Sequence, residues 1–335
     1  MEEFIKGLPK VELHLHIEGS MEPEMIFRLA QRNGIALAHE SIESLKEAYA
    51  FRDLQSFLNL YYDNMQVLVN EEDFFDVTYA YFERIAEDNV IHTEIFFDPQ
   101  AHLARGVAIQ TQLAGITRGC QKARATLGIS SEIILSFLRD MSEESALATL
   151  EAALPYRDNF IGVGLDSAEV GNPPEKFERV FARAAELGLY RVAHAGEEGS
   201  HEYISGALDS LHVQRIDHGV RSLESEALVD RLVELNMPLT VCPLSNIYLK
   251  VFDDMAQHTL RQMFDNGLNV TLNSDDPAYF GGYMNDNFMA VQQAFNFDRE
   301  TWTQLTCNAI DASFASDERK AKMYDALVEY LSSHD

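Results

Sequence analysis

The sequence predicts a closed barrel of eight parallel strands with helices between them, a single (β/α)8 domain over residues 1–335. Eight short apolar segments recur along the chain, and amphipathic stretches of helical length separate most of them. This alternation predicts a parallel sheet, and eight repeats favour a closed barrel over an open doubly wound sheet. The expected strands are residues 11–19, 91–99, 132–139, 160–167, 190–197, 215–219, 238–243 and 269–277.

The helices between the strands are predicted from their periodicity and their ends. Residues 174–188 are amphipathic and end at a glycine, which suits a helix C-cap, and residues 224–236 have the same pattern. The fourth expected strand contains Gly162 and Gly164, but Ser167 follows where a GxGxxG turn needs its third glycine. A dinucleotide-binding fold is therefore disfavoured.

Two segments depart from an even barrel. Residues 20–89 are too long for one helix and are expected to form several, placed as a lid over the catalytic face. Within them, four apolar residues at helical spacing allow two interpretations, a stripe facing the core or an apolar wall over a flat ligand: Leu54, Phe57, Leu58 and Tyr61. The tail after Tyr283 is expected to add further helices.

Composition limits the partners and the compartment. The formal charge of −28 disfavours binding to nucleic acid or anionic membranes, and we interpret it as a device for solubility or salt tolerance. The three cysteines form no CxxC pair, which argues against a disulfide framework and a cysteine-based metal site. With neither a signal-like nor a membrane-spanning apolar run, a cytoplasmic protein is expected. The oligomeric state is left open, a homo-oligomer included.

Ionisable residues gather at the ends of four expected strands, where barrel enzymes carry their chemistry. A strand histidine alone is more often a core residue, and a lone DD pair is usually a helix cap. At one end of a closed barrel, however, so many ionisable groups indicate a bound cation. Imidazoles with one carboxylate suit Zn²⁺ and leave a position for water. The residues are His14, His16 and Glu18, then His194 and Glu197, then Asp217 and His218, and finally Asp275 and Asp276.

Five segments in order resemble the adenosine/adenine deaminase family of metal-dependent amidohydrolase barrels. They are LPKVELHLHIEGS (8–20), VAHAGEEG (192–199), RIDHGV (215–220), CPLSN (242–246) and VTLNSDDPAYFGG (270–282). The resemblance implies zinc-dependent deamination of a purine, with one Zn²⁺ per chain. It implies zinc ligation by His14, His16, His194 and Asp275, proton exchange with the purine by Glu197, handling of the attacking water by His218, and contact with the base by Asp276.

The chemistry of deamination needs groups of these kinds. Zinc lowers the pKa of bound water, and His218 is expected to take the water's proton and stabilise the hydroxide. Attack at C6 shifts electron density to N1, which Glu197 would protonate, and Asp276 would hold the N7 edge. A metal-dependent amide hydrolase would share the metal and the water but would not need an acid for a ring nitrogen. A degenerate barrel acting as a binding module would lack ligands, and none is missing from the sequence.

Two positions favour free adenine, deaminated to hypoxanthine and ammonia in purine salvage, over adenosine. Where the adenosine pattern has HLDG and LAGDE, this chain has Glu18 in HIEG and Glu169 in DSAEVG, as in the adenine deaminase branch. We expect Glu169 to accept the N9 hydrogen of adenine and Glu18 to fill the space of a sugar. Alternatively, Glu169 only caps the loop that follows it. Adenosine and N6-substituted adenines stay open as alternative substrates.

Overall fold

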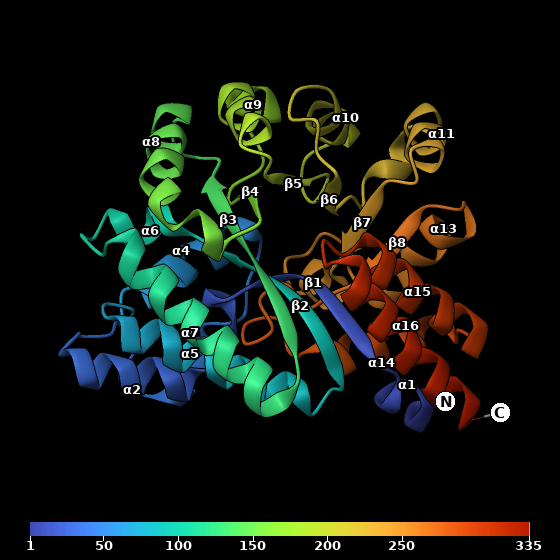
Figure 1. Ribbon diagram of the computed structural model, residues 1–335, viewed down its shortest axis with the longest axis horizontal. Coiled ribbons are helices and arrows are strands. Elements are labelled where there is room, and N and C mark those ends of the chain that lie inside the picture. Colours follow the sequence, from blue (N-terminus) through green and yellow to red (C-terminus); the bar gives the residue numbers. More distant parts are fainter. Residues whose placement is uncertain (335) are drawn as a thin grey trace.

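The computed structural model describes residues 1–334 and shows eight parallel strands in the order β1 to β8 (Figure 1). The barrel closes where Leu15 of the first strand bridges Asp275, which follows the last one. There His16 N donates to Asp275 O at 3.0 Å, and Asp275 N donates to His14 O at 3.1 Å. The predicted (β/α)8 barrel is thus confirmed. The strands are β1 (Lys10–His16), β2 (Val90–Phe97), β3 (Ser130–Leu138), β4 (Gly162–Asp166), β5 (Tyr190–Ala195), β6 (Arg215–His218), β7 (Pro238–Val241) and β8 (Asn269–Leu272).

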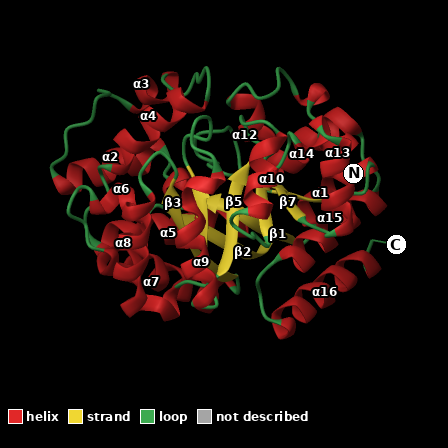
Figure 2. Cartoon of the chain, turned by 90° about the horizontal axis from the view of Figure 1, so that it is seen from above, coloured by secondary structure: helices red, strands yellow, loops and turns green. Residues whose placement is uncertain are grey.

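Helices surround the strands on all sides (Figure 2). Those that follow strands β2 to β7 are α6 (Pro99–Leu103), α7 (Ile109–Leu127), α8 (Glu143–Ala153), α9 (Glu178–Glu186), α10 (His201–Asp209), α11 (Glu226–Glu234), α12 (Pro243–Tyr248) and α13 (Leu260–Asp265). Short 3-10 turns interrupt the connections at Glu18–Ser20, Leu154–Asn159, Pro174–Phe177, Ser222–Glu224 and Met255–Gln257. Within residues 1–334, none of the helices combines the length and the apolar character needed to cross a membrane.

The ends of the chain cover the seam of the barrel. The short helix α1 (Glu2–Gly7) precedes β1, and three helices follow β8, namely α14 (Met284–Phe295), α15 (Arg299–Ala312) and α16 (Asp317–Ser332). Helix α15 packs against both β8 and β1, and α16 packs on α15. The C-terminal helices expected from the sequence therefore occupy the outer ring where the barrel closes.

Between β1 and β2 the chain forms α2 (Pro23–Asn33), α3 (Ile42–Glu47), α4 (Leu54–Met65) and α5 (Glu71–Ala86). Helix α2 begins at a proline, whose missing N–H costs nothing in the first turn, and ends at Gly34 with a φ of 65°. Helix α4 begins at Asp53, whose carboxylate accepts from Ser56 N at 2.8 Å. Its apolar stripe packs against Leu249, Tyr279 and Phe280 at the mouth of the barrel.

Strand β1 explains why polar residues alternate near the N-terminus. All seven of its residues are buried, because helices cover its outer face and the barrel interior covers the other. Leu13 and Leu15 belong to the main apolar core, whereas Glu12, His14 and His16 share the opposite face by the two-residue period of a strand. Since that face points into the barrel, it carries the two histidines to its C-terminal mouth.

Candidate metal and purine site

A cavity lies at the C-terminal mouth of the barrel. Six of the ionisable residues predicted at the strand ends line it. Further strand-end residues and a roof of apolar and aromatic side chains, mostly from α4, complete the lining. The strand-end residues are His16, His194, Glu197, His218, Asp275 and Asp276, and the others are Leu54, Phe57, Leu58, Tyr61, Tyr62, Asp98, Asp166, Ser167, Leu249 and Phe280. The apolar stripe of α4 is therefore both a packed face and one wall of the cavity.

The four expected metal ligands converge at the floor of this cavity. His14 Nε2 lies 3.1 Å from Asp275 Oδ1, His16 Nε2 lies 3.4 Å from the same oxygen, and the Nε2 atoms of His16 and His194 are 3.1 Å apart. Ligands of one tetrahedral zinc lie ~3.3 Å apart, because the bonds to zinc are ~2.0–2.2 Å long. The donor separations thus fit one ion.

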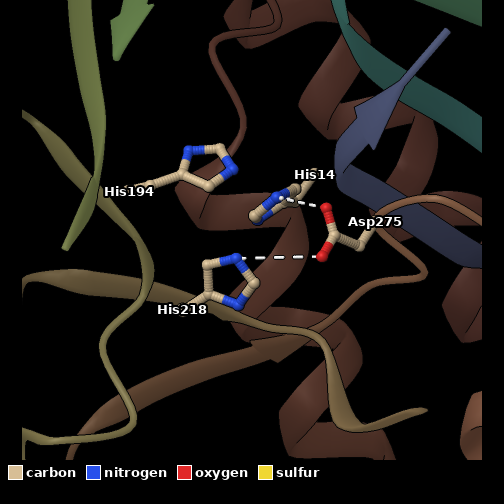
Figure 3. A group of neighbouring side chains, drawn as sticks. All are labelled: His14, His194, His218 and Asp275. Atoms are coloured by element: carbon tan, nitrogen blue, oxygen red, sulfur yellow. Dashed lines mark ion pairs between the residues drawn. The ribbon is translucent and has the colours of Figure 1, made fainter. Parts of the chain in front are cut away.

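Figure 3 shows His218 beside His14, His194 and Asp275, and these four residues also offer atoms close enough to share an ion. His218 Nε2 lies 3.8 Å from Asp275 Oδ2, whereas His14 and His16 make their contacts with Oδ1. Asp275 Oδ2 also accepts from Ser245 Oγ at 2.7 Å. Distance alone keeps His218 inside the group, so its hydrogen bonds decide whether it is a ligand.

The hydrogen bonds of His14 leave the correct nitrogen free for a metal. Thr240 Oγ1 donates to Asp217 Oδ1 at 2.8 Å, so this hydroxyl can only accept from His14 Nδ1, which lies 3.0 Å away. The ring proton is then on Nδ1, and buried Nε2 has no hydrogen-bond partner within residues 1–334. A buried lone pair of this kind needs a cation, which supports the fit of the donor set to zinc.

Carboxylates lie opposite the Nδ1 atoms of the other two imidazoles, at distances longer than a hydrogen bond. His194 Nδ1 lies 3.6 Å from Asp217 Oδ2, and His16 Nδ1 lies 3.6 Å from Asp166 Oδ2. Burial and the neighbouring imidazoles hold the pKa of His194 well below its ordinary value, so its ring stays neutral. Asp217, which had no assigned role in the sequence, thus lies beside two of the expected ligands, His194 directly and His14 through the hydroxyl of Thr240.

His218 is fixed in the opposite orientation by a chain of hydrogen bonds. Leu260 N donates to His258 Nδ1 at 3.0 Å, so the His258 proton is on Nε2 and is donated to Asn246 Oδ1 at 3.0 Å. The amide Nδ2 of Asn246 then faces His218 Nδ1 at 3.4 Å. Burial lowers the pKa of His218 to about 3, so the ring is neutral and its single proton lies on Nε2. His218 therefore presents an N–H, not a lone pair, toward Glu197 Oε1 and Asp275 Oδ2.

Glu197 faces the cavity with a raised pKa. Burial, followed by the charge of Asp275, raises the pKa of Glu197 well above its ordinary value. Its Oε1 is buried, has no hydrogen-bond partner among the described residues, and lies 3.7 Å from His218 Nε2. Such a carboxyl can deliver a proton at neutral pH.

The loop that carries Glu197 is held by Glu169, and this corrects the expected role of Glu169. Its carboxylate accepts from the backbone N–H groups of Gly196, Glu197, Glu198 and Gly199 at 2.7, 3.1, 2.8 and 2.8 Å. Glu169 is buried and does not line the cavity. Because both oxygens are already used by four donors, neither is placed to accept the N9 hydrogen. The geometry supports the alternative that Glu169 caps a loop.

Glu18 also lies behind the cavity rather than in it. Its Oε1 accepts from Asp98 N at 3.1 Å and bonds His102 Nε2 at 2.8 Å. Glu18 is fully buried and does not line the cavity. The expectation that its side chain fills the space of a sugar is therefore wrong, and Glu18 can act on the cavity only through Asp98, whose backbone it holds.

Asp276 lies in the cavity as expected. Burial, followed by the charge of Asp275, raises the pKa of Asp276 well above its ordinary value, and its Oδ1 has no partner among residues 1–334. A Cβ at Gly19 would lie only 1.9 Å from that oxygen, so the glycine of HIEG makes room for the Asp276 side chain. A protonated Asp276 can donate to a ring nitrogen such as N7.

Sequence reasoning did not find two carboxylates of the cavity, Asp98 and Asp166. Asp98 follows β2 directly and Asp166 ends β4, so the strand-end rule that found the other residues could have found these as well.

Ser167, His218 and Asp275 have φ values of 73°, 66° and 65°. Positive φ in three non-glycine residues at the mouth indicates backbone strain held at a functional site.

A model of the adenosine deaminase family matches residues 9–330. The chain belongs to this family. It is 55% identical over 334 residues to a protein of Hahella chejuensis named adenine deaminase, with full coverage of both chains. The crystal structure of adenine deaminase from Arthrobacter aurescens is 54% identical and has a TM-score of 0.95, covering 97% of this chain and 99% of that one. The crystal structure of an amidohydrolase from Burkholderia ambifaria with bound zinc is 29% identical and has a TM-score of 0.91. The match covers 99% of this chain and 93% of that one. These matches confirm the family expected from the sequence.

Proposed function

We propose that this protein catalyses the hydrolytic deamination of adenine to hypoxanthine and ammonia, a reaction of purine salvage. The observation that carries the proposal is a buried carboxyl, Glu197, that faces the metal-ligand group inside a roofed cavity and whose pKa is raised by burial. Full-length relatives named adenine deaminase support adenine as the substrate.

We further propose one Zn²⁺ per chain, held by His14, His16, His194 and Asp275. The lone pairs and the carboxylate oxygen that converge at the floor of the cavity support this set. Zinc, when bound, supplies a hydroxide nucleophile at neutral pH by lowering the pKa of water.

The chain's own residues then manage the protons. Glu197 gives its proton to N1 as a hydroxide derived from water bonds to C6. It then takes the proton of that oxygen and passes it to the amine, so the C6–N6 bond breaks and ammonia leaves, and the proton released by the next water restores the acid. His218 holds the incoming oxygen by donating its Nε2–H, because the hydrogen bonds of Asn246 and His258 keep Nδ1 unprotonated. This differs from the sequence-based expectation that His218 accepts the water's proton. Asp276 orients the purine through N7.

The roof keeps bulk water out during the reaction. Leu54, Phe57 and Leu58 of α4 line the cavity and pack with Leu249 and Phe280 from the far side of the mouth. We propose that residues 20–89 act as the lid and that residues 1–335 work as one domain. The three cysteines, unpaired within the described chain, fit a reducing compartment, and we place the protein in the cytoplasm.

The test is a comparison of kcat/KM for adenine, adenosine and N6-methyladenine, with metal analysis of the same samples. We expect one zinc per chain and a preference for adenine on the order of 10³ or more over adenosine. Equal or better turnover of adenosine would replace free adenine with the nucleoside, and preferred N6-methyladenine would move the assignment to N6-substituted bases. Hydrolysis of simple amides without purine turnover would overturn deamination itself.

A further inference from the structure

Two carboxylates in the cavity, Asp98 and Asp166, take no part in the proton transfers described above. Asp98 and Asp166 are 1% and 2% exposed, and their oxygens lie within 4.8 Å of each other and of His16. Asp98 Oδ1 and both oxygens of Asp166 have no hydrogen-bond partner within residues 1–334, and Asp98 Oδ2 receives only a long bond from Tyr61 Oη at 3.5 Å. Buried acceptors that line a cavity and lack donors indicate a ligand that brings one.

A second cation is the first alternative, and the orientation of His16 argues against it. His16 Nε2 points to His194 and Asp275, so a metal there takes its lone pair and the ring proton lies on Nδ1. This Nδ1–H faces Asp166 Oδ2 at 3.6 Å. His16 therefore presents an N–H, not a lone pair, to the two carboxylates, which disfavours a cation there. Burial and the charge of Asp166 raise the pKa of Asp98 well above its ordinary value, and the carbonyl oxygen of this carboxyl group can still accept from a ligand N–H.

The order of strands around the barrel places Asp98 at a defined edge of the purine. Glu197 follows β5 and Asp276 follows β8. When the purine places N1 at Glu197 and N7 at Asp276, its opposite edge points toward the mouth ends of β2, β3 and β4. Asp98 follows β2 and Asp166 ends β4. The remaining edge of free adenine carries N3 and N9, and N9 is the position with a hydrogen to donate.

We propose that Asp98 accepts the N9 hydrogen of adenine and thereby selects the free base over nucleosides and other N9-substituted purines. Glu18 holds Asp98 in place through the backbone N–H of Asp98. The inference rests on the proposed adenine deamination. It assigns to Asp98 the contact with the N9 hydrogen that the sequence had suggested for Glu169. An N9-substituted purine lacks the donor and leaves a buried acceptor unpaired, which is the kind of mismatch that binding sites reject most strongly.

The experiment compares adenine with 9-methyladenine in the zinc-loaded wild type and in Asp98→Ala, Asp98→Asn and Asp158→Asn. Asp158 is exposed in the connection before β4 and serves as the control. We expect Asp98→Ala to lose about 10²-fold in kcat/KM for adenine, mostly through KM, while 9-methyladenine turnover is unchanged or higher. Asp98→Asn keeps a carbonyl acceptor and should retain part of the preference for adenine, and Asp158→Asn should match wild type.

Each outcome separates the inference from the function on which it rests. If Asp98→Ala and Asp98→Asn lower turnover of both substrates by the same factor, Asp98 is structural and the inference is overturned. If wild type binds two ions and the variants bind one, the pair is a cation site and the inference is again overturned. If wild type does not deaminate adenine at all, the proposed function fails first. Should Asp98→Ala be recovered unfolded, the adenine to 9-methyladenine ratio in Asp98→Asn decides, since it must fall below the wild-type value.

Discussion

Removing the carboxylate of Glu169 should disable the acid of the reaction without removing the metal. In Glu169→Ala, four backbone N–H groups of residues 196–199 lose their acceptor at once. An unsatisfied buried donor costs ~1–3 kcal/mol, so the native loop conformation loses about 4 kcal/mol even at the low end of that range. Water that enters the space and local rearrangement of the loop limit the loss, so the global free energy of unfolding should fall by no more than about that amount.

The catalytic consequence follows from which residue the loop carries. Glu197 is the second residue of this loop, and a displacement of about 1 Å from a productive position costs on the order of 10² in rate. His194, in contrast, keeps its carbonyl bond from Arg139 Nη1 at 2.6 Å. We therefore expect kcat for adenine to fall about 10²-fold or more while zinc content stays near that of wild type.

Urea unfolding, backbone hydrogen exchange of residues 196–199, steady-state kinetics and metal analysis together test this. Glu169→Gln provides a graded variant, because its amide offers one acceptor and turns an NH₂ toward the remaining donors, so its losses should be intermediate. Glu178→Ala, on the exposed face of the nearby helix α9, is the matched control. A Glu169→Ala enzyme with unchanged kcat, unchanged exchange in the loop and a raised KM for adenine alone would refute the reasoning and restore direct contact with the base.

Four further variants test the rest of the site. Glu197→Gln keeps the volume but carries no transferable proton, so kcat should fall by about 10² to 10⁴ with zinc and unfolding free energy intact, as measured by kinetics, metal analysis and urea melts. His16→Ala should lose zinc and activity together, and tight zinc retention by this variant would remove His16 from the ligand set. Asn246→Asp puts an acceptor opposite His218 Nδ1, so the ring proton should move to that nitrogen, visible in ¹⁵N shifts, with purine binding kept and kcat about 10²-fold lower. Burial lowers the pKa of His258 to about 3, whereas the pKa of this histidine in the unfolded chain is about 6.5. Between these two pH values the unfolded state binds more protons, so the free energy of unfolding falls as the pH falls. From pH 6.5 to 5 this lowers the stability of wild type by about 1.6 kcal/mol, and His258→Gln should lack this loss in urea melts at the two pH values.

The barrel, and the gathering of the expected metal ligands at its mouth, could be predicted because both depend on short-range periodicity, whereas the ligand set itself came from the family resemblance. The two-residue period of β1 puts His14 and His16 on one face, and parallel strands in a barrel bring all their C-terminal ends to one mouth. No contact between distant residues had to be known. The same rule applied to β2 and β4 also indicates Asp98 and Asp166, but Asp98 precedes a proline and suits a turn equally well, so the sequence alone does not separate the two interpretations.

Glu169 could not be placed in this way, because its partners are set by the path of another loop. Its four donors lie 27 to 30 residues further along the chain and belong to the turn after β5. The strands β4 and β5 pair only at Gly162 with Tyr190 and Val163 with Arg191, so their mouth ends are not held by a ladder. Glu169 supplies the missing acceptors there. A sequence shows that a carboxylate follows a strand, but not whether it turns to the cavity or to the neighbouring backbone.

The role of each histidine is likewise decided by its hydrogen-bond partners, which lie elsewhere in the chain. His14 and His218 both come within reach of Asp275, and their imidazoles are chemically identical. Thr240 must accept from His14 Nδ1, which turns a lone pair to the metal group, while Asn246 must donate to His218 Nδ1, which turns an N–H there instead. One hydroxyl and one amide thus separate a ligand from a hydrogen-bond donor. It follows that exchanging donor for acceptor at position 246 alters the chemistry of His218 without touching any residue that meets the substrate.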